Sequence, residues 1–346
     1  MVRHAHGRPQ KQRFYAQEIA EKCQDAATLP KIKSLQFARD LHEIGGTSPY
    51  RNLNDKIAVI YLDGNGFSKI QAKHCQSADA LGRWDEYIQG KRCEFLKDFL
   101  LRIQDDPDFK TQDGAMRLET LLWGGDEITL VTPAWKGFEV LHYFYQQSEI
   151  WKFREALTHA GGLVFCHIKT PIYRMRDLAK QLADNVKDSP GGGRRQNLYD
   201  YMVLESIDYP AEPLKAFWQR RYKEFASCRQ PLPPIPWHSI ASEVWDLLRS
   251  TSEGQGSIPK GQVHALVRTA LYGPREEIAL NSFDEQLKRF ETVINNQELW
   301  KGIQNMLQKL FPGACHVWPW IHLIELWDYL ALEPEIDEMQ TEVSHG

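Results

Sequence analysis

The chain lacks a long apolar segment. No apolar run within its 346 residues approaches the roughly 20 residues that a membrane-spanning helix requires. The first six residues also lack the apolar stretch that characterises a secretory signal peptide. These absences argue against a membrane protein, and we expect a cytoplasmic protein without a membrane partner.

Paired cysteines, a strong net charge and internal repeats are missing as well. The six cysteines include no Cys-x-x-Cys pair, so a zinc ribbon is not expected, and their wide scatter predicts reduced thiols. A net charge of −4 argues against a protein that coats nucleic acid, although it leaves room for a local basic groove. Because no repeat of about 20–50 residues is found, a solenoid or propeller is not expected.

Apolar and aromatic residues are plentiful instead. Apolar residues make up 42% of the chain and charged residues 25%, and there are 11 Trp, 13 Tyr and 15 Phe. This composition is typical of a globular protein with a substantial core, and the length suffices for two domains. We expect, in order, an N-terminal helical segment, a central domain, a helix with a Pro-rich connector, a C-terminal helical domain and an acidic tail: residues 1–54, 55–210, 211–238, 239–332 and 333–346.

Apolar patterning in the central domain predicts strands that alternate with helices. Residues 57–62, IAVIYL, form a continuous β-branched run that is typical of a strand buried on both faces. Further strands are predicted at residues 115–123, 128–132, 160–168 and 199–205. Helices are predicted at residues 78–103, 137–157 and 173–187, after N-terminal helices at 14–23 and 32–44. The order β-α-ββ-α-β-α-β predicts an α/β fold whose sheet has mixed strand directions.

Some side chains receive a structural interpretation. Four C-terminal tryptophans stand at helical spacing and are interpreted as core residues: Trp300, Trp318, Trp320 and Trp327. Lys91 and Arg92 are expected on a solvent-facing side of their helix. Residues 189–193 are expected to form a flexible loop.

Two acidic turns carry the chemical signal. Asp63 follows the strand at residues 57–62, and the tetrapeptide GGDE at residues 124–127 joins the two strands of a predicted hairpin. If these strands are neighbours, the carboxylates converge at one end of the sheet. Mg²⁺ (or Mn²⁺) is bound by carboxylates together with water and substrate phosphates. Either turn alone is ordinary, because Asp-Gly and Gly-Gly-Asp are common turn sequences, but the pair predicts a metal site.

The same segments resemble a known superfamily. YLDGNGFSKI at residues 61–70, LWGGDEI at 122–128, GGLVFCHIKTPI at 161–172 and ADNVK at 183–187 resemble the motifs of palm-domain nucleotide cyclases. These comprise the GGDEF proteins and the polymerase-like large subunit of type III CRISPR complexes, and the CRISPR branch is closer. The resemblance covers about residues 55–206. It implies a ferredoxin-like palm, an α+β form of the predicted fold, followed by a C-terminal helical domain.

The resemblance assigns roles to individual residues. Asp63, Asp126 and Glu127 would hold the metal and form the catalytic centre. Glu127 stands where the CRISPR enzymes have Asp, and either carboxylate can bind a metal. Asn65 falls where several relatives have a second Asp. Lys187 would contact a triphosphate as a point charge. The implied nucleotide-binding residues are Gly64, Asn65, Gly66, Phe67, Gly124, Gly125 and Lys187.

The resemblance also implies an activity. We expect a metal-dependent nucleotidyltransferase that converts nucleoside triphosphates, above all ATP, into a cyclic di- or oligonucleotide messenger and releases pyrophosphate, in antiviral signalling of the CRISPR type. Because only one set of motifs is present, we expect a homodimer or a partner palm to hold the second nucleotide. One alternative is a non-catalytic palm subunit that binds RNA or a partner in a CRISPR-like ribonucleoprotein. A template-dependent polymerase and a mononucleotide cyclase are two others.

Overall fold

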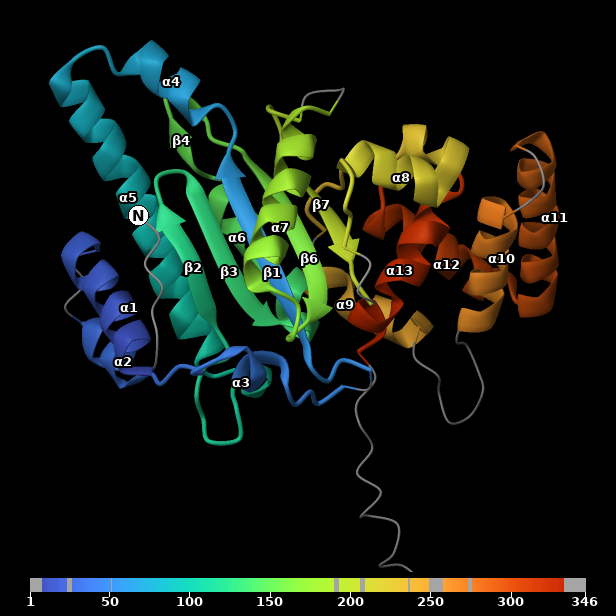
Figure 1. Ribbon diagram of the computed structural model, residues 1–346, viewed down its shortest axis with the longest axis horizontal. Helices are drawn as coiled ribbons and strands as arrows, with labels where there is room; N and C mark the ends of the chain where they lie inside the picture. Colours follow the sequence, from blue (N-terminus) through green and yellow to red (C-terminus); the bar gives the residue numbers. More distant parts are fainter. Residues whose placement is uncertain are drawn as a thin grey trace, which may run out of the picture.

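The molecule is built around a five-stranded mixed sheet with the order β2-β3-β1-β6-β7 (Figure 1). The computed structural model describes residues 8–23, 27–50, 52–189, 193–205, 209–235, 237–248, 258–272 and 276–332. The strands of the sheet are β1 (Lys56–Gly64), β2 (Glu119–Gly124), β3 (Glu127–Pro133), β6 (His159–His167) and β7 (Leu198–Val203). Strand β1 is antiparallel to β3 and β6, whereas β6 and β7 are parallel. The predicted α/β fold with mixed strand directions is confirmed.

The central strand β1 is covered on both faces. Helix α7 (Ile172–Lys187) lies on one face, and α5 (Ala78–Ile103) and α6 (Gly137–Ser148) lie on the other (Figure 1). Gly162 pairs with Tyr61, and a Cβ at Gly162 would overlap the Ala179 carbonyl of α7. Tyr61 and Asp63, two residues apart on the strand, therefore both face α7.

One tertiary contact explains two differences from the predicted elements. Phe37 forms a parallel bridge with Met116, and Ala38 donates a backbone hydrogen bond to the Met116 carbonyl at 2.8 Å. Extended backbone at this bridge cannot be helical, so the predicted helix 32–44 was wrong. It divides into α2 (Leu29–Ser34) and α3 (Leu41–Gly45). Because Met116 pairs with Phe37 and not with β3, it lies outside β2, which begins only at Glu119.

The helix predicted at residues 137–157 is shorter in the structure. Helix α6 ends at Ser148, and the predicted helical residues beyond it contain a small hairpin of β4 (Lys152–Phe153) and β5 (Glu155–Ala156). Arg154 turns this hairpin with a φ of 63°, a conformation that a helix does not contain. A short helix that was not predicted, α4 (Phe67–His74), follows the first acidic turn.

The C-terminal part is helical and packs against β7 and β6. Its helices are α8 (Leu214–Tyr222), α9 (Trp237–Leu248), α10 (Lys260–Tyr272), α11 (Glu276–Ile294), α12 (Gln297–Leu310) and α13 (Trp318–Ala331). Trp318, Trp320 and Trp327 are buried, as predicted. The Tyr201 hydroxyl of β7 lies 2.6 Å from Nδ1 of His322 on α13, which ties this part to the sheet.

Two predicted segments are not covered. The acidic tail at residues 333–346 and residues 190–192 of the predicted loop lie outside the described part of the chain. The domain boundaries stay predictions. Among the helices of the described ranges, none combines the length and the apolar character needed to cross a bilayer.

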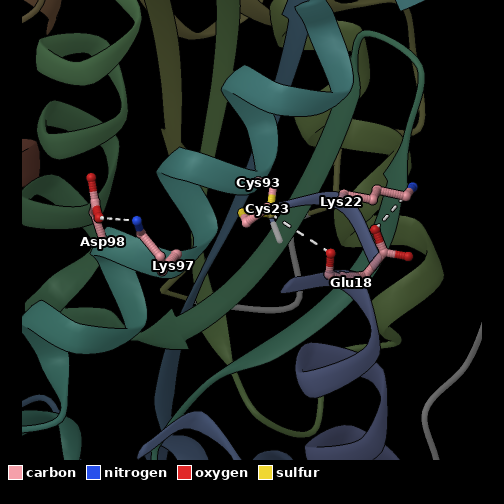
Figure 2. Close-up of a disulfide and its surroundings, with 6 residues drawn as sticks. All are labelled: Glu18, Lys22, Cys23, Cys93, Lys97 and Asp98. Atoms are coloured by element: carbon pink, nitrogen blue, oxygen red, sulfur yellow. Dashed lines mark hydrogen bonds and ion pairs between the residues drawn. A yellow bond between two sulfur atoms is a disulfide. The ribbon is translucent and has the colours of Figure 1, made fainter. Parts of the chain in front are cut away.

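A disulfide joins the end of the N-terminal helix to helix α5. Cys23, next to the end of α1 (Arg8–Lys22), is bonded to Cys93 of α5, and their Cα atoms are 5.8 Å apart (Figure 2). The prediction of reduced thiols was therefore wrong for this pair. Because 70 residues separate the two cysteines, only the packing of α1 on α5 brings them together.

Candidate functional site

The two acidic turns meet at one end of the sheet. Asp63 of β1 is the direct register partner of Glu127 on β3. Directly opposed residues on neighbouring strands have Cβ atoms about 5 Å apart, so the two carboxylates share one face. The Gly64 N–H donates to the Asp126 carbonyl at 3.1 Å, which places the hairpin turn beside the end of β1. The structure thus brings all three acids to one sheet edge.

Asp63 is the most buried of these acids and has a cationic partner. Its side chain is 9% exposed, and Oδ2 lies 2.6 Å from Nζ of Lys187 at the end of α7. Burial raises the pKa of Asp63; Lys187 lowers it, while the charges of Asp126 and Glu127 raise it, and the net shift is upward. Burial is the largest of these causes, so the upward shift reflects first of all the removal of the Asp63 carboxylate from water.

Tyr61 positions Glu127. Its hydroxyl donates a hydrogen bond of 2.6 Å to Oε1 of Glu127, two residues along the neighbouring strand from its register partner Thr129. Burial, followed by this contact, raises the pKa of Tyr61, so the phenol is held as a donor. Sequence reasoning missed this residue, although its place two residues before Asp63 puts both on one strand face.

Lys180 is a second cation near the acids. It lies seven residues, or two helical turns, before Lys187, and this spacing was an available signal that sequence reasoning missed. Its Nζ lies 3.1 Å from the carboxylate of Asp184 and 5.5 Å from the centre of the Tyr61 ring. Partial burial lowers its pKa, but Asp184, Asp63 and Glu127 outweigh this and raise it, so Lys180 is charged.

Arg92 holds the hairpin turn from the opposite side. It is 6% exposed and donates from Nη1 to the Gly125 carbonyl at 3.1 Å. Its guanidinium lies 4.9 Å from the ring centre of Trp123 on β2. The prediction of a solvent-facing Arg92 was wrong, because the hairpin covers that side of α5. Gly125, the first residue of the two-residue turn, has a φ of 58°, which glycine adopts without steric cost.

Two side chains of the turn after Asp63 make contacts inside the protein. The Asn65 amide group donates to Thr158, Gly193 and Gln196, while its buried Oδ1 has no hydrogen-bond partner within the described residues. Phe67 is 5% exposed and packs against Trp84 and His159, so its ring lies in the core.

The backbone at Gly66 is sterically open. Gly66 precedes α4 with a φ of 68°, and a Cβ there would meet no atom within 4 Å. The first N–H groups of any helix lack an acceptor within the helix and are therefore free to bind an anion.

The residues fit a hard divalent cation that is shared with a substrate. In the described ranges, no group of three or more acids, histidines or cysteines is already arranged around one point. Mg²⁺, however, is commonly held by one or two carboxylates together with substrate phosphates. Asp63 facing Glu127, with Asp126 in the adjoining turn, supplies such a donor set.

Comparisons with known proteins give similarity only among solved structures. The sequence matches no family model and no curated protein. Csm1 in T. onnurineus is similar with a TM-score of 0.47 and 16% identity, over 86% of this chain and 40% of that one. A Csm1-Csm4 cassette in complex with one ATP has a TM-score of 0.47 and 16% identity, over 85% of this chain and 38% of that one.

A Csm1-Csm4 cassette in complex with cA4 is also similar, with a TM-score of 0.43 and 16% identity, over 88% of this chain and 39% of that one. The chain therefore spans about two fifths of these solved chains. Its structure is similar to that of Csm1 at low identity.

Proposed function

We propose that this protein is a metal-dependent nucleotidyltransferase that joins nucleoside triphosphates, with ATP the expected substrate, into a cyclic di- or oligonucleotide. The observation that carries the proposal is the convergence of Asp63 with Asp126 and Glu127 at one sheet edge, beside Lys187. Neither turn alone would support it. The antiviral setting rests on the sequence resemblance.

The residues of the site suggest how it would bind a triphosphate. Asp63 and the hairpin acids would hold a divalent cation, which when bound polarises phosphoryl oxygens and activates an attacking hydroxyl. Lys187 now pairs with the Asp63 carboxylate. When the metal binds Asp63, the Lys187 ammonium group would instead contact the phosphate oxygens, which are anionic as well. Tyr61 keeps Glu127 directed toward the shared face.

The reaction is a substitution at phosphorus. The 3′-hydroxyl oxygen of one nucleotide attacks the α-phosphorus of another, the bond to pyrophosphate breaks, and the hydroxyl proton passes to water. One acid set holds one reacting triphosphate, so a second palm, from another copy or a partner, would present the attacking nucleotide. The protein would therefore be active only when two palms are assembled. If the second palm is another copy of this chain, the specific activity should rise with protein concentration.

Mass spectrometry of reaction products tests the proposal. Wild type would be incubated with all four triphosphates and Mg²⁺ or Mn²⁺, in parallel with Asp126→Ala. We expect cyclic products and pyrophosphate from wild type and none from the variant. Asp177→Ala, an exposed aspartate on α7, is the matched control and should retain activity. Equal product from wild type and Asp126→Ala would refute the site.

A non-catalytic palm subunit is the second candidate. It is favoured by the Lys187–Asp63 ion pair, which in this state neutralises the acid that a metal would use. On this reading the protein would bind RNA or a partner without turnover. Absence of any product with either metal, together with retained nucleotide-independent binding of RNA, would support it over the enzyme.

A further inference from the structure

A cavity lies at the end of the sheet remote from the acids. Register places Leu198 of β7 opposite Ala160, the partner of Asp63, so Val203 at the other end of β7 lies far along the strand from the acidic turns. Beside Val203, the strand end and helices α8, α10 and α13 enclose about 740 Å³. We call this the α8–α10 groove. Its volume is in the range of sites for small ligands.

The lining of the groove is rich in cations. Four basic residues line it, namely Arg220, Arg221, Lys223 and Arg268, and His264 stands one helical turn before Arg268 on α10. All five side chains belong to exposed residues. A single helix face with scattered lysines would be an ordinary solvated surface, but these residues converge on one cavity from α8, from Lys223 directly after it, and from α10.

The acids of the lining are already paired. Glu205 pairs with Lys56 at 2.6 Å, Asp328 with Lys260 at 2.7 Å, and Glu325 with Arg221 at 3.0 Å. By contrast, Arg268 and Lys223 have no carboxylate partner in the part of the chain that the structure describes. The groove therefore presents uncompensated positive charge, which favours an anionic ligand.

An exposed aromatic ring stands at the same place. Tyr272, at the end of α10, is 72% exposed and lines the groove, and Nζ of Lys223 lies 5.6 Å from the centre of its ring. Large exposed aromatic rings beside cations are the elements with which proteins bind single-stranded nucleic acid, because the ring stacks on a base and the cations contact phosphate. An acidic peptide would use the charges but would not need the ring.

We propose that the α8–α10 groove binds a nucleotide phosphate and its base, supplied by a single-stranded RNA or by a free nucleotide. Arg268 and Lys223 contact the phosphate, and Tyr272 stacks on the base. The site is separate from the acidic turns and requires neither a metal nor turnover. It therefore goes beyond the proposed nucleotidyltransferase activity.

Fluorescence anisotropy tests this with a fluorescein-labelled, short single-stranded RNA and the full chain in EDTA, where metal-dependent binding at the acids is suppressed. We expect Arg268→Glu and Tyr272→Ala each to weaken binding roughly tenfold. Arg289→Glu, an exposed arginine on α11 outside the groove, makes the same charge change and should leave affinity unchanged. Competition with unlabelled ATP distinguishes the sources: displacement at similar concentrations identifies a free-nucleotide site, and its absence identifies an RNA strand.

Three outcomes would overturn the proposal. The first is no binding of RNA or ATP. The second is an equal loss for Arg289→Glu and Arg268→Glu, which would indicate attraction to overall charge. The third is full affinity of Tyr272→Ala together with displacement by a polyglutamate peptide, which would indicate an acidic protein partner. Because Asp126→Ala should bind the probe normally, failure of this site and failure of the acidic site are distinguishable.

Discussion

The ammonium group of Lys187 lies 2.6 Å from Oδ2 of Asp63, so α7 closes onto the end of β1 through an ion pair whose two side chains are 12% and 9% exposed. The contact joins the cation expected to bind phosphate with the acid expected to bind metal. Each side chain compensates the other's buried charge. In the proposed reaction, a triphosphate would take the place of Asp63 at Lys187, and the metal ion would take the place of Lys187 at Asp63.

Lys187→Met should destabilise the fold by roughly 3 kcal/mol at neutral pH, because it leaves Asp63 buried without its cation. The pKa of Asp63, already raised, would rise further. An acid with a raised folded-state pKa contributes stability at low pH that is lost as pH rises through that pKa. The deficit should therefore shrink on acidification, as measured by urea unfolding from neutral to acidic pH.

The control for this prediction is Asp63→Asn. In that background Lys187→Met should cost much less, because no carboxylate charge is left to compensate. A deficit that is independent of pH, or equal in the two backgrounds, would mean that Lys187 contributes by packing alone.

Tyr61→Phe should lower turnover about tenfold if Glu127 takes part in the proposed reaction, because one hydrogen bond to a charged acceptor is lost. Steady-state kinetics as a function of Mg²⁺ concentration would measure the effect. In a Glu127→Ala background the same substitution should have no further effect, since Tyr61 acts through Glu127. An equal loss in both backgrounds would show that Tyr61 has another role.

Gly162→Ala should destabilise the protein by about 2 kcal/mol or more, because its Cβ would overlap the Ala179 carbonyl of α7, a backbone atom that cannot rotate away. Gly82→Ala on α5 is the matched control, since a Cβ there meets nothing within 4 Å. It should stabilise the helix by roughly 0.5–1 kcal/mol. Thermal unfolding of both variants distinguishes steric overlap from a general effect of replacing glycine.

Reduction of the Cys23–Cys93 disulfide should lower the free energy of unfolding by about 4 kcal/mol in the chain-entropy description of a loop of this length. Denaturant unfolding with and without a reducing agent would measure it. The Cys23→Ser variant should have the stability of the reduced protein and no further response to reductant. Cys228→Ser, which removes an exposed free thiol, should behave as wild type. An unchanged stability on reduction would contradict this.

Local hydrophobic patterns predicted the long helix and the central strand correctly. The helix over residues 78–103 has the predicted bounds, because its apolar positions repeat at helical spacing over many turns. The buried strand β1 was equally clear, since it is apolar on both faces. The shorter elements were misjudged where a distant residue intervened, as Met116 does at Phe37.

The sequence by itself determined the fold class and the chemical character of the candidate site, because a strand pattern or an acidic turn can be recognised from residues that are neighbours in the chain. Only the tertiary structure decided that Asp63 faces Glu127, that Tyr61 and Arg92 hold the hairpin acids and turn, and that Cys23 meets Cys93. The physical reason is that register and helix packing depend on side chains far apart in the chain, whose encounter no local pattern encodes.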